Sequence, residues 1–111
     1  MFYQAYYQFE PTPYRQFPPV DTSTFEQSLQ TFQALLEQGR TLVNSLVTSE
    51  ERMFQLMDAA QRSDDQEVDR IIRETGIASI VETSYSPTGV SFTLRTEPPC
   101  CTLTMYLVWG R

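Results

Sequence analysis

The hydrophobic period of the chain changes once, at Gly76. Before Gly76, apolar residues recur every three or four positions, as in amphipathic helices, and after it they alternate with polar residues, as in half-buried strands. A single change of period predicts helices followed by strands, not alternating βαβ units. We therefore expect an α+β fold in which two to three helices pack on a three-stranded antiparallel β-meander, preceded by an N-terminal extended arm.

Three helices are predicted before Gly76, over residues 23–47, 49–62 and 64–75. Each begins with the Ser/Thr-x-x-Glu/Gln pattern of a capping box, in which the hydroxyl accepts a hydrogen bond from an amide of the first turn. The three boxes are Ser23-Thr-Phe-Glu26, Thr48-Ser-Glu-Glu51 and Ser63-Asp-Asp-Gln66. Gly76 follows the third helix, at a place where a glycine in the left-handed conformation commonly ends a helix.

The first predicted helix carries an apolar stripe in which steps of four and three residues alternate. The stripe consists of Phe25, Leu29, Phe32, Leu36, Val43 and Leu46, with Gly39 in the remaining position. Core helices of ordinary domains and helix–helix interfaces between chains share this spacing. The stripe therefore either packs inside its own domain or forms a helix interface between chains, and the spacing leaves both open.

Strands are predicted over residues 77–85, 90–95 and 100–109, because these segments alternate with period two and are rich in β-branched and aromatic residues. Ser86-Pro-Thr-Gly89 joins the first two strands as a hairpin. Its proline stands at the second turn position, and we expect its glycine to be left-handed. Residues 21–111 are thus expected to form a single α+β domain.

An aromatic and proline-rich arm, residues 1–20, precedes this domain. The arm holds seven aromatic residues and four prolines, with no helical or strand period. Proline removes backbone donors, so we expect an extended arm, and its aromatic density is unusual for a solvated linker. The arm therefore either covers its own domain or contacts another chain. The candidate contact residues are Phe2, Tyr3, Tyr6, Tyr7, Phe9, Tyr14 and Phe17.

The composition removes most catalytic chemistry. The chain contains no His, and all eight of its cationic side chains are Arg. Without His and Lys, Ser/Cys–His pairs, Schiff bases and most protein-only zinc sites are excluded, and no Gly-rich phosphate loop is present. We therefore expect that the protein is not an enzyme and has no catalytic residue, no cofactor and no metal.

The charge of the chain is concentrated in its helical part. The net charge is −6, and residues 21–76 carry eleven acidic side chains against five Arg. Nucleic acids and anionic membranes need a basic face, so neither is expected as a partner. No segment reads as a secretory signal peptide or reaches the roughly 20 apolar residues of a membrane span. We expect a cytoplasmic protein that leaves the cytoplasm only by assembling onto something.

Cys100 and Cys101 are neighbours at the start of the third predicted strand. Successive strand residues point to opposite faces, so one thiol would face the helices and the other would face away. The two thiols would then be small hydrophobic residues, or the outward one would form an interchain disulfide. Metal binding is the weakest alternative, because no His or further Cys could complete a thiolate site.

Several segments together carry a resemblance. The Tyr/Pro-rich start runs into Pro-Pro-Val-Asp, residues 57–94 read MDAAQRSDDQEVDRIIRETGIASIVETSYSPTGVSFTL, and the Cys-Cys pair precedes an aliphatic strand that ends in Trp. These segments, residues 59–94 above all, resemble the small inner spore-coat proteins of Bacillus-type endospore formers, of the YuzC kind. The resemblance implies a sporulation protein made in the mother-cell cytoplasm and then deposited in the spore coat, without catalytic activity.

The sequence as a whole predicts a non-catalytic structural component of the bacterial spore coat. We expect it to self-associate through its aromatic arm and the apolar face of its first helix. Its partners would be further copies of itself, as a homo-oligomer or higher assembly, and other spore-coat proteins, but no nucleic acid and no membrane. The alternative is a soluble adaptor or regulatory protein that binds one specific partner without polymerising.

Overall fold

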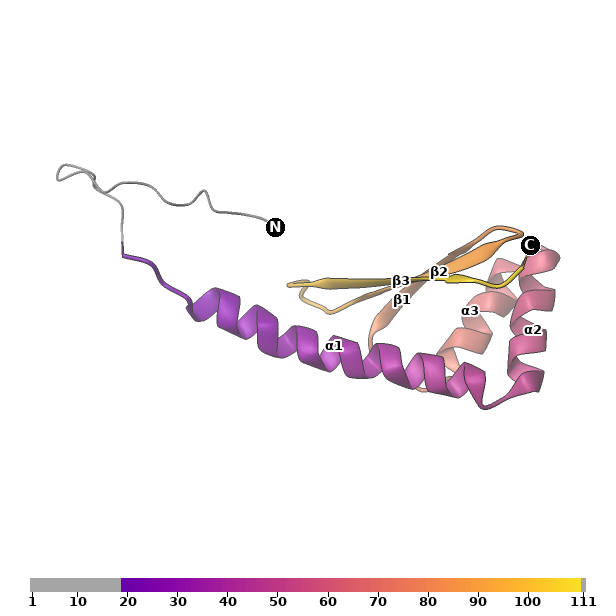
Figure 1. Ribbon diagram of the computed structural model, residues 1–111, viewed down its shortest axis with the longest axis horizontal. Coiled ribbons are helices and arrows are strands. Elements are labelled where there is room, and N and C mark those ends of the chain that lie inside the picture. Colours follow the sequence, from indigo (N-terminus) through magenta and orange to yellow (C-terminus); the bar gives the residue numbers. More distant parts are fainter. Residues whose placement is uncertain (1–18, 111) are drawn as a thin grey trace.

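The computed structural model of the protein describes residues 19–110, which form three helices followed by three strands (Figure 1). The elements are α1 (Ser23–Val47), α2 (Glu50–Gln61), α3 (Asp65–Arg73), β1 (Ile80–Tyr85), β2 (Gly89–Arg95) and β3 (Thr102–Val108). The strands form one antiparallel sheet in the order β1-β2-β3. The α+β class expected from the sequence is confirmed, whereas the seven aromatic residues of the arm lie outside the described residues.

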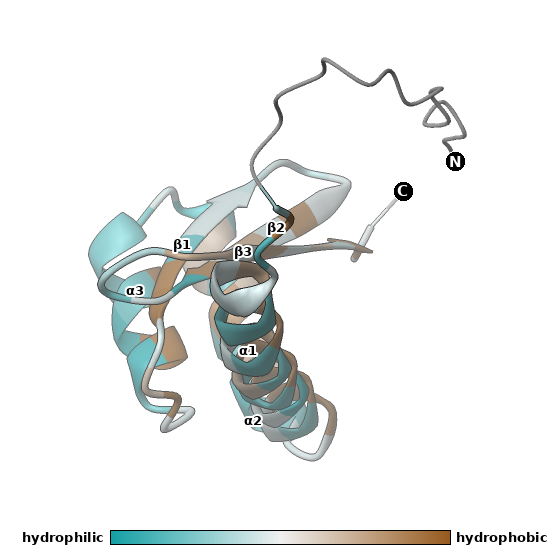
Figure 2. Ribbon diagram, turned by 90° about the vertical axis from the view of Figure 1, so that its left-hand side faces the viewer, coloured by the Kyte–Doolittle hydropathy of each residue, from teal (hydrophilic) through white to brown (hydrophobic). Residues whose placement is uncertain are grey.

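The sheet has a buried face and an exposed face. Val90, Phe92 and Leu94 of the central strand β2 are buried, whereas the residues between them face the polar side. On that polar side Thr93 and Thr104 share a hydrogen bond of 3.2 Å across β2 and β3, and the pairing continues from Gly89 to Arg95 without a break. Figure 2, which looks along α1, shows the three helices gathered on one side of the sheet.

Each helix contributes one buried stripe to the core beneath the sheet. Helix α3 buries Val68, Ile71 and Ile72. Helix α2 buries Leu56, Ala59 and Ala60, whereas Met57 lies exposed. Helix α1 buries Leu35, Gly39 and Leu42. None of the helices within residues 19–110 is long and apolar enough to cross a membrane.

Gly39 packs tightly against the third strand of the sheet. A Cβ atom at this position would lie 3.0 Å from Cδ2 of Leu103 and 3.3 Å from the sulfur of Met105, both on β3. Such separations are shorter than ordinary van der Waals contacts, so a side chain here would have to displace the side chains of Leu103 and Met105 by a few tenths of an ångström. The glycine that interrupts the apolar stripe is therefore itself a packing residue.

The two later helices are capped one residue after the position expected from the sequence. Ser49, not Thr48, caps α2 by accepting a hydrogen bond of 3.0 Å from the amide of Arg52. The amide and hydroxyl of Thr48 instead bond back to the carbonyl of Asn44, which ends α1. The expected capping box at Thr48 is therefore wrong, because that residue belongs to the preceding helix end.

Helix α3 repeats the same shift by one residue. Asp64 caps it by accepting from the amide of Glu67, at 3.2 Å, whereas Ser63 has a φ of 56° and closes the turn after α2. The box expected at Ser23 is also wrong, since Ser23 lies inside α1 and donates its amide to Asp21 at 3.0 Å. Which residue caps a helix depends on the direction of the chain at the preceding turn, and the four-residue sequence pattern carries no information on that direction.

Gly89 is extended rather than left-handed, because it already belongs to β2. A Cβ atom on Gly89 would meet the phenol ring of Tyr106, a diagonal neighbour on β3. The glycine leaves room for this ring and does not serve turn geometry, since a side chain here would have to move the exposed Tyr106 aside. Gly76, by contrast, has the expected left-handed φ of 85°.

The first strand begins three residues later than expected. The amide of Ala78 donates a hydrogen bond of 2.6 Å to the side chain of Gln38 on α1. This bond ties the segment before Ile80 to the helix and not to β2, so the ladder starts only at the pair Ile80–Arg95.

Candidate assembly surfaces

Helix α1 has an exposed apolar stripe besides its buried one. Its members are partly open to solvent, with exposed fractions from 39% for Val43 to 65% for Phe25. The five residues are Phe25, Leu29, Leu36, Val43 and Val47. At 3.6 residues per turn they fall within a sector of about 40°, roughly 90° around the helix from the buried stripe. This α1 stripe is therefore a straight apolar line along almost the whole helix.

The structure divides the six stripe residues named from the sequence into two groups. Phe25, Leu29, Leu36 and Val43 belong to the α1 stripe, whereas Phe32 and Leu46 are half-buried and pack against the core. Val47 was missed, because the alternation of four and three residues ended at Leu46. A spacing of seven and then four residues, counted from Leu36, would have pointed to it.

The exposed apolar area of the α1 stripe limits how tightly this stripe alone can hold two chains together. Fully burying a side chain of this size contributes roughly 1.5–3 kcal/mol, so covering the exposed half of each contributes about 5 kcal/mol for a whole chain. Two chains pairing their stripes would gain about 10 kcal/mol, which is of the same order as the 4–15 kcal/mol that association costs. The stripe supports a weak symmetric pair, and tight assembly needs a further contact.

The two cysteines are joined to each other in a disulfide within one chain. The expectation that both lie in a strand with opposed thiols is wrong, because Pro98 and Pro99 precede them and β3 begins only at Thr102. Cys100 is exposed and Cys101 is half-buried. The sulfur of Cys101 lies 3.5 Å from the carbonyl oxygen of Ser28 on α1, a contact without a hydrogen bond since a disulfide sulfur carries no proton. In this form neither sulfur is free to pair with another chain.

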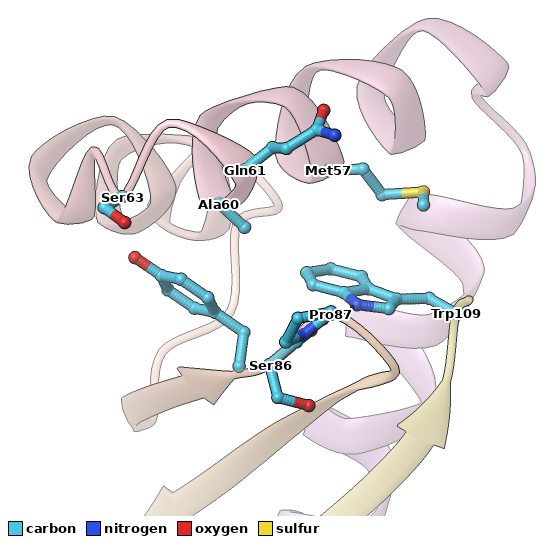
Figure 3. Close-up of a pocket in the computed structure, with 8 residues that line it drawn as sticks. Met57, Ala60, Gln61, Ser63, Ser86, Pro87 and Trp109 are labelled. Atoms are coloured by element: carbon cyan, nitrogen blue, oxygen red, sulfur yellow. Dashed lines mark hydrogen bonds between the residues drawn. The ribbon is translucent and has the colours of Figure 1, made fainter. Parts of the chain in front are cut away.

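A hollow of about 480 Å³ opens where α2, the β1–β2 turn and the residues after β3 meet (Figure 3). We call it the end pocket. Figure 3 shows the indole of Trp109 beside Pro87, with Met57 reaching toward them from α2. The remaining lining residues are Ala60, Gln61, Ser63, Tyr85 and Ser86.

Two hydrogen bonds hold the aromatic walls of the end pocket. The indole nitrogen of Trp109 donates to the carbonyl oxygen of Ser86 at 2.9 Å. The Tyr85 hydroxyl donates to the carboxylate of Asp65, and this bond raises the pKa of Tyr85 above its ordinary value of 10.0. The two rings lie 6.5 Å apart between centroids. Both rings are therefore fixed in place while their apolar faces line the hollow.

The ion pairs of α2 and α3 are local and solvent-exposed. Arg62 pairs with Asp58 at 3.1 Å and with Asp64 at 3.3 Å, and these carboxylates raise its pKa. Arg70 bridges Glu67 and Glu74 in the same way, which lowers the pKa of Glu67. Exposed pairs of this kind contribute little stability. Within residues 19–110 no three acidic or cysteine side chains are grouped so that they could hold a metal ion.

Comparison with known families agrees with the resemblance noted from the sequence. A family model described as "YuzC spore coat inner layer protein" matches residues 22–104, about three quarters of the chain. The matched segment contains all three helices, β1, β2 and the cysteine pair. No curated protein matches the chain, and no solved structure does.

Proposed function

Because the chain belongs to the YuzC spore coat inner layer protein family, we propose that it is a non-catalytic structural component of the coat that associates with copies of itself. The observation that carries this proposal is the α1 stripe, five apolar side chains in one line on an otherwise polar helix surface. Large exposed apolar surfaces on small proteins mark contact sites. Self-association would cover this one.

In the proposed contact, the stripes of two chains pack against each other. Leu29, Leu36 and Val43 recur every seven residues, which is the repeat that two helices need to stay in contact along their length. A pair of identical stripes is self-complementary, so this contact alone stops at a two-fold dimer. Growth beyond a dimer needs a second, different surface.

The aromatic arm is proposed as this second surface. Tyr-rich and Phe-rich segments are enriched in protein contacts, and residues 1–20 hold half of the aromatic side chains of the chain. Arm contacts with further copies would extend the assembly, and arm contacts with other coat proteins would attach it. The proposal includes synthesis in the mother-cell cytoplasm, deposition in the spore coat, and no role for nucleic acid, membrane or cofactor.

An interchain disulfide is also proposed, formed by exchange. A thiolate from a reduced copy or another coat protein attacks the exposed sulfur of Cys100, a new interchain S–S bond forms, and Cys101 leaves as a thiolate. Non-reducing electrophoresis of the Cys100→Ser and Cys101→Ser proteins tests this step. Crosslinked species should depend on Cys100, and an oxidised wild type that remains wholly monomeric when mixed with reduced copies, without any small-molecule thiol, contradicts it.

Sedimentation or light scattering over a range of concentrations tests self-association itself. Leu29→Glu places a charge in the α1 stripe, whereas Gln30→Glu adds the same charge to the neighbouring exposed position outside it. We expect the first substitution to weaken the pair and the second to leave it unchanged. Deletion of residues 1–18 should reduce the larger species further.

Other outcomes favour the adaptor alternative. If the wild type is monomeric at every concentration and a pull-down retains one defined protein, the chain is a binding module and not a polymerising one. Equal behaviour of the two Glu variants would show that α1 is not the contact.

A further inference from the structure

We propose that the end pocket receives the proline-rich part of the arm, residues 9–19, from a second copy of the chain. This inference rests on the proposed self-association and assigns the arm a docking place. Three observations carry it: the chemistry of the pocket, the charges beside it, and the distance between the pocket and the start of the described chain.

The end pocket has the chemistry that recognises an extended proline segment. Prolines favour the polyproline II conformation, which has no internal hydrogen bonds and presents its rings to aromatic grooves. Trp109 and Tyr85 provide two fixed rings 6.5 Å apart, with Pro87 and Met57 as apolar neighbours. The volume of about 480 Å³ lies within the range of concave binding sites. The arm supplies Pro11, Pro13, Pro18 and Pro19, separated by Tyr14 and Phe17.

The charges beside the pocket complement the arm. Asp65, which accepts from the pocket residue Tyr85, forms no ion pair with any of residues 19–110, and the nearby cluster of Asp58, Arg62 and Asp64 has one more acid than base. The pocket also lies at the C-terminal end of α2, the negative end of the helix dipole. Arg15 is the one cation among residues 1–20 and stands between the two proline pairs.

The geometry favours a second copy over the chain's own arm. The elements that line the pocket, the C-terminal end of α2 and the chain after β3, lie far from the start of α1 (Figure 1), and the 25 residues of α1 span about 37 Å. The indigo segment before α1 runs away from the helix in the same view, so the proline segment begins still farther from the pocket. The eight residue-to-residue steps from Pro19 back to Pro11 reach at most about 28 Å when fully extended. The proline segment therefore cannot reach the pocket of its own chain, whereas another chain can bring its arm there.

The consequence is a contact that propagates. Each chain offers an arm at one end and a pocket at the other, so the contact joins two different surfaces. Contacts of this kind form rings or open chains and do not stop at a pair. Combined with the two-fold pairing of the α1 stripe, they would link dimers into an extended assembly.

The chain contains a single tryptophan, and it lies in the pocket, so its emission reports occupancy directly. A synthetic peptide of residues 8–20 is titrated into the full-length protein while Trp109 emission and molecular mass are followed. We expect the peptide to shift the emission and to reduce the mass by competition. A control peptide in which the four prolines are replaced by Ala should do neither, and equal effects of the two peptides would overturn the inference.

Two substitutions on α2 separate the pocket from the rest of the surface. Met57→Glu puts a charge into the pocket at a side chain that is 42% exposed, and Phe54→Glu puts it at a side chain that is 68% exposed and outside the pocket. We expect only Met57→Glu to weaken assembly, by about tenfold or more in dissociation constant, and to abolish the peptide response. Pro87→Ala, on the β1–β2 turn, should also weaken assembly and reduce the response of Trp109 emission to the peptide. Melting by circular dichroism verifies that each variant is folded.

The outcomes distinguish the docking place from the proposed function. If deletion of residues 1–18 weakens assembly but Met57→Glu and Pro87→Ala do not, the arm docks elsewhere and this inference fails while self-association stands. If the deletion changes Trp109 emission at a concentration where the protein is monomeric, the arm occupies its own pocket, which also overturns the inference. If the deletion changes neither assembly nor Trp109 emission, the proposal that the arm takes part in assembly is refuted.

Discussion

Leu35 and Leu36 are adjacent leucines on α1 that the structure places in opposite environments. Leu35 is 0% exposed in the core, and Leu36 is 48% exposed in the α1 stripe. Leu35→Ala removes a buried side chain, which costs about 2–5 kcal/mol, a large part of the roughly 5–15 kcal/mol that stabilises a domain of this size. Leu36→Ala removes a side chain that is only half withdrawn from water, so the free energy of unfolding of the monomer should fall by about 1 kcal/mol.

Urea unfolding followed by circular dichroism measures both values, at a protein concentration low enough for the monomer to dominate. Raising the concentration adds a second test, because association stabilises the folded chain by mass action. The wild type and Leu35→Ala should then gain stability, whereas Leu36→Ala should gain less. Equal losses for the two variants at low concentration would refute the assignment of buried and exposed faces. A concentration dependence that Leu36→Ala leaves intact would refute the role of the stripe.

Three further predictions concern the fold. Gly39→Ala should lower the free energy of unfolding by about 1 kcal/mol, because overpacking against Leu103 costs about 1–3 kcal/mol and helix propensity returns only about 1 kcal/mol. Chemical denaturation measures this difference, and a stabilised variant would contradict the close contact. Ser49→Ala should cost about 1 kcal/mol through loss of the α2 cap, with Ser49→Asp as the variant that retains it. The hydrogen bond to Asp65 raises the pKa of Tyr85 in the folded protein. The stabilisation that this bond contributes is therefore fully present below pH 10.0 and is lost as the pH rises through the raised pKa. Tyr85→Phe should flatten this alkaline decline in the free energy of unfolding, and an unchanged slope would contradict the bond.

Local signals account well for the elements. The change of period at Gly76 separates three helices from three strands, and the strand alternation places Phe92 and Leu94 in the core, where the structure has them. The caps were less well predicted. Polar residues stand side by side at each helix start, so overlapping capping patterns compete, and the path of the turn selects Ser49 and Asp64.

Gly39 and Gly89 both have packing neighbours that the local sequence does not reveal. Gly39 lowers helix propensity, and Gly89 resembles a turn residue, when each is considered within its own segment. In the fold, Gly39 faces Leu103 and Gly89 faces Tyr106, both on β3. The local sequence around a glycine cannot indicate a contact with a side chain that is distant along the chain.

The sequence alone determined the order, type and approximate length of the elements, because hydrophobic period depends only on neighbouring residues. It also excluded chemistry that requires a His or Lys side chain of this chain, since residue types missing from the sequence cannot be restored by folding. The tertiary structure decided which part of the α1 face is exposed, because the core covers only one sector of the helix. Phe32 and Leu46 pack against this core, whereas Leu36 remains exposed. It also built the end pocket, since Met57, Pro87 and Trp109 come from three separate segments that only packing brings together.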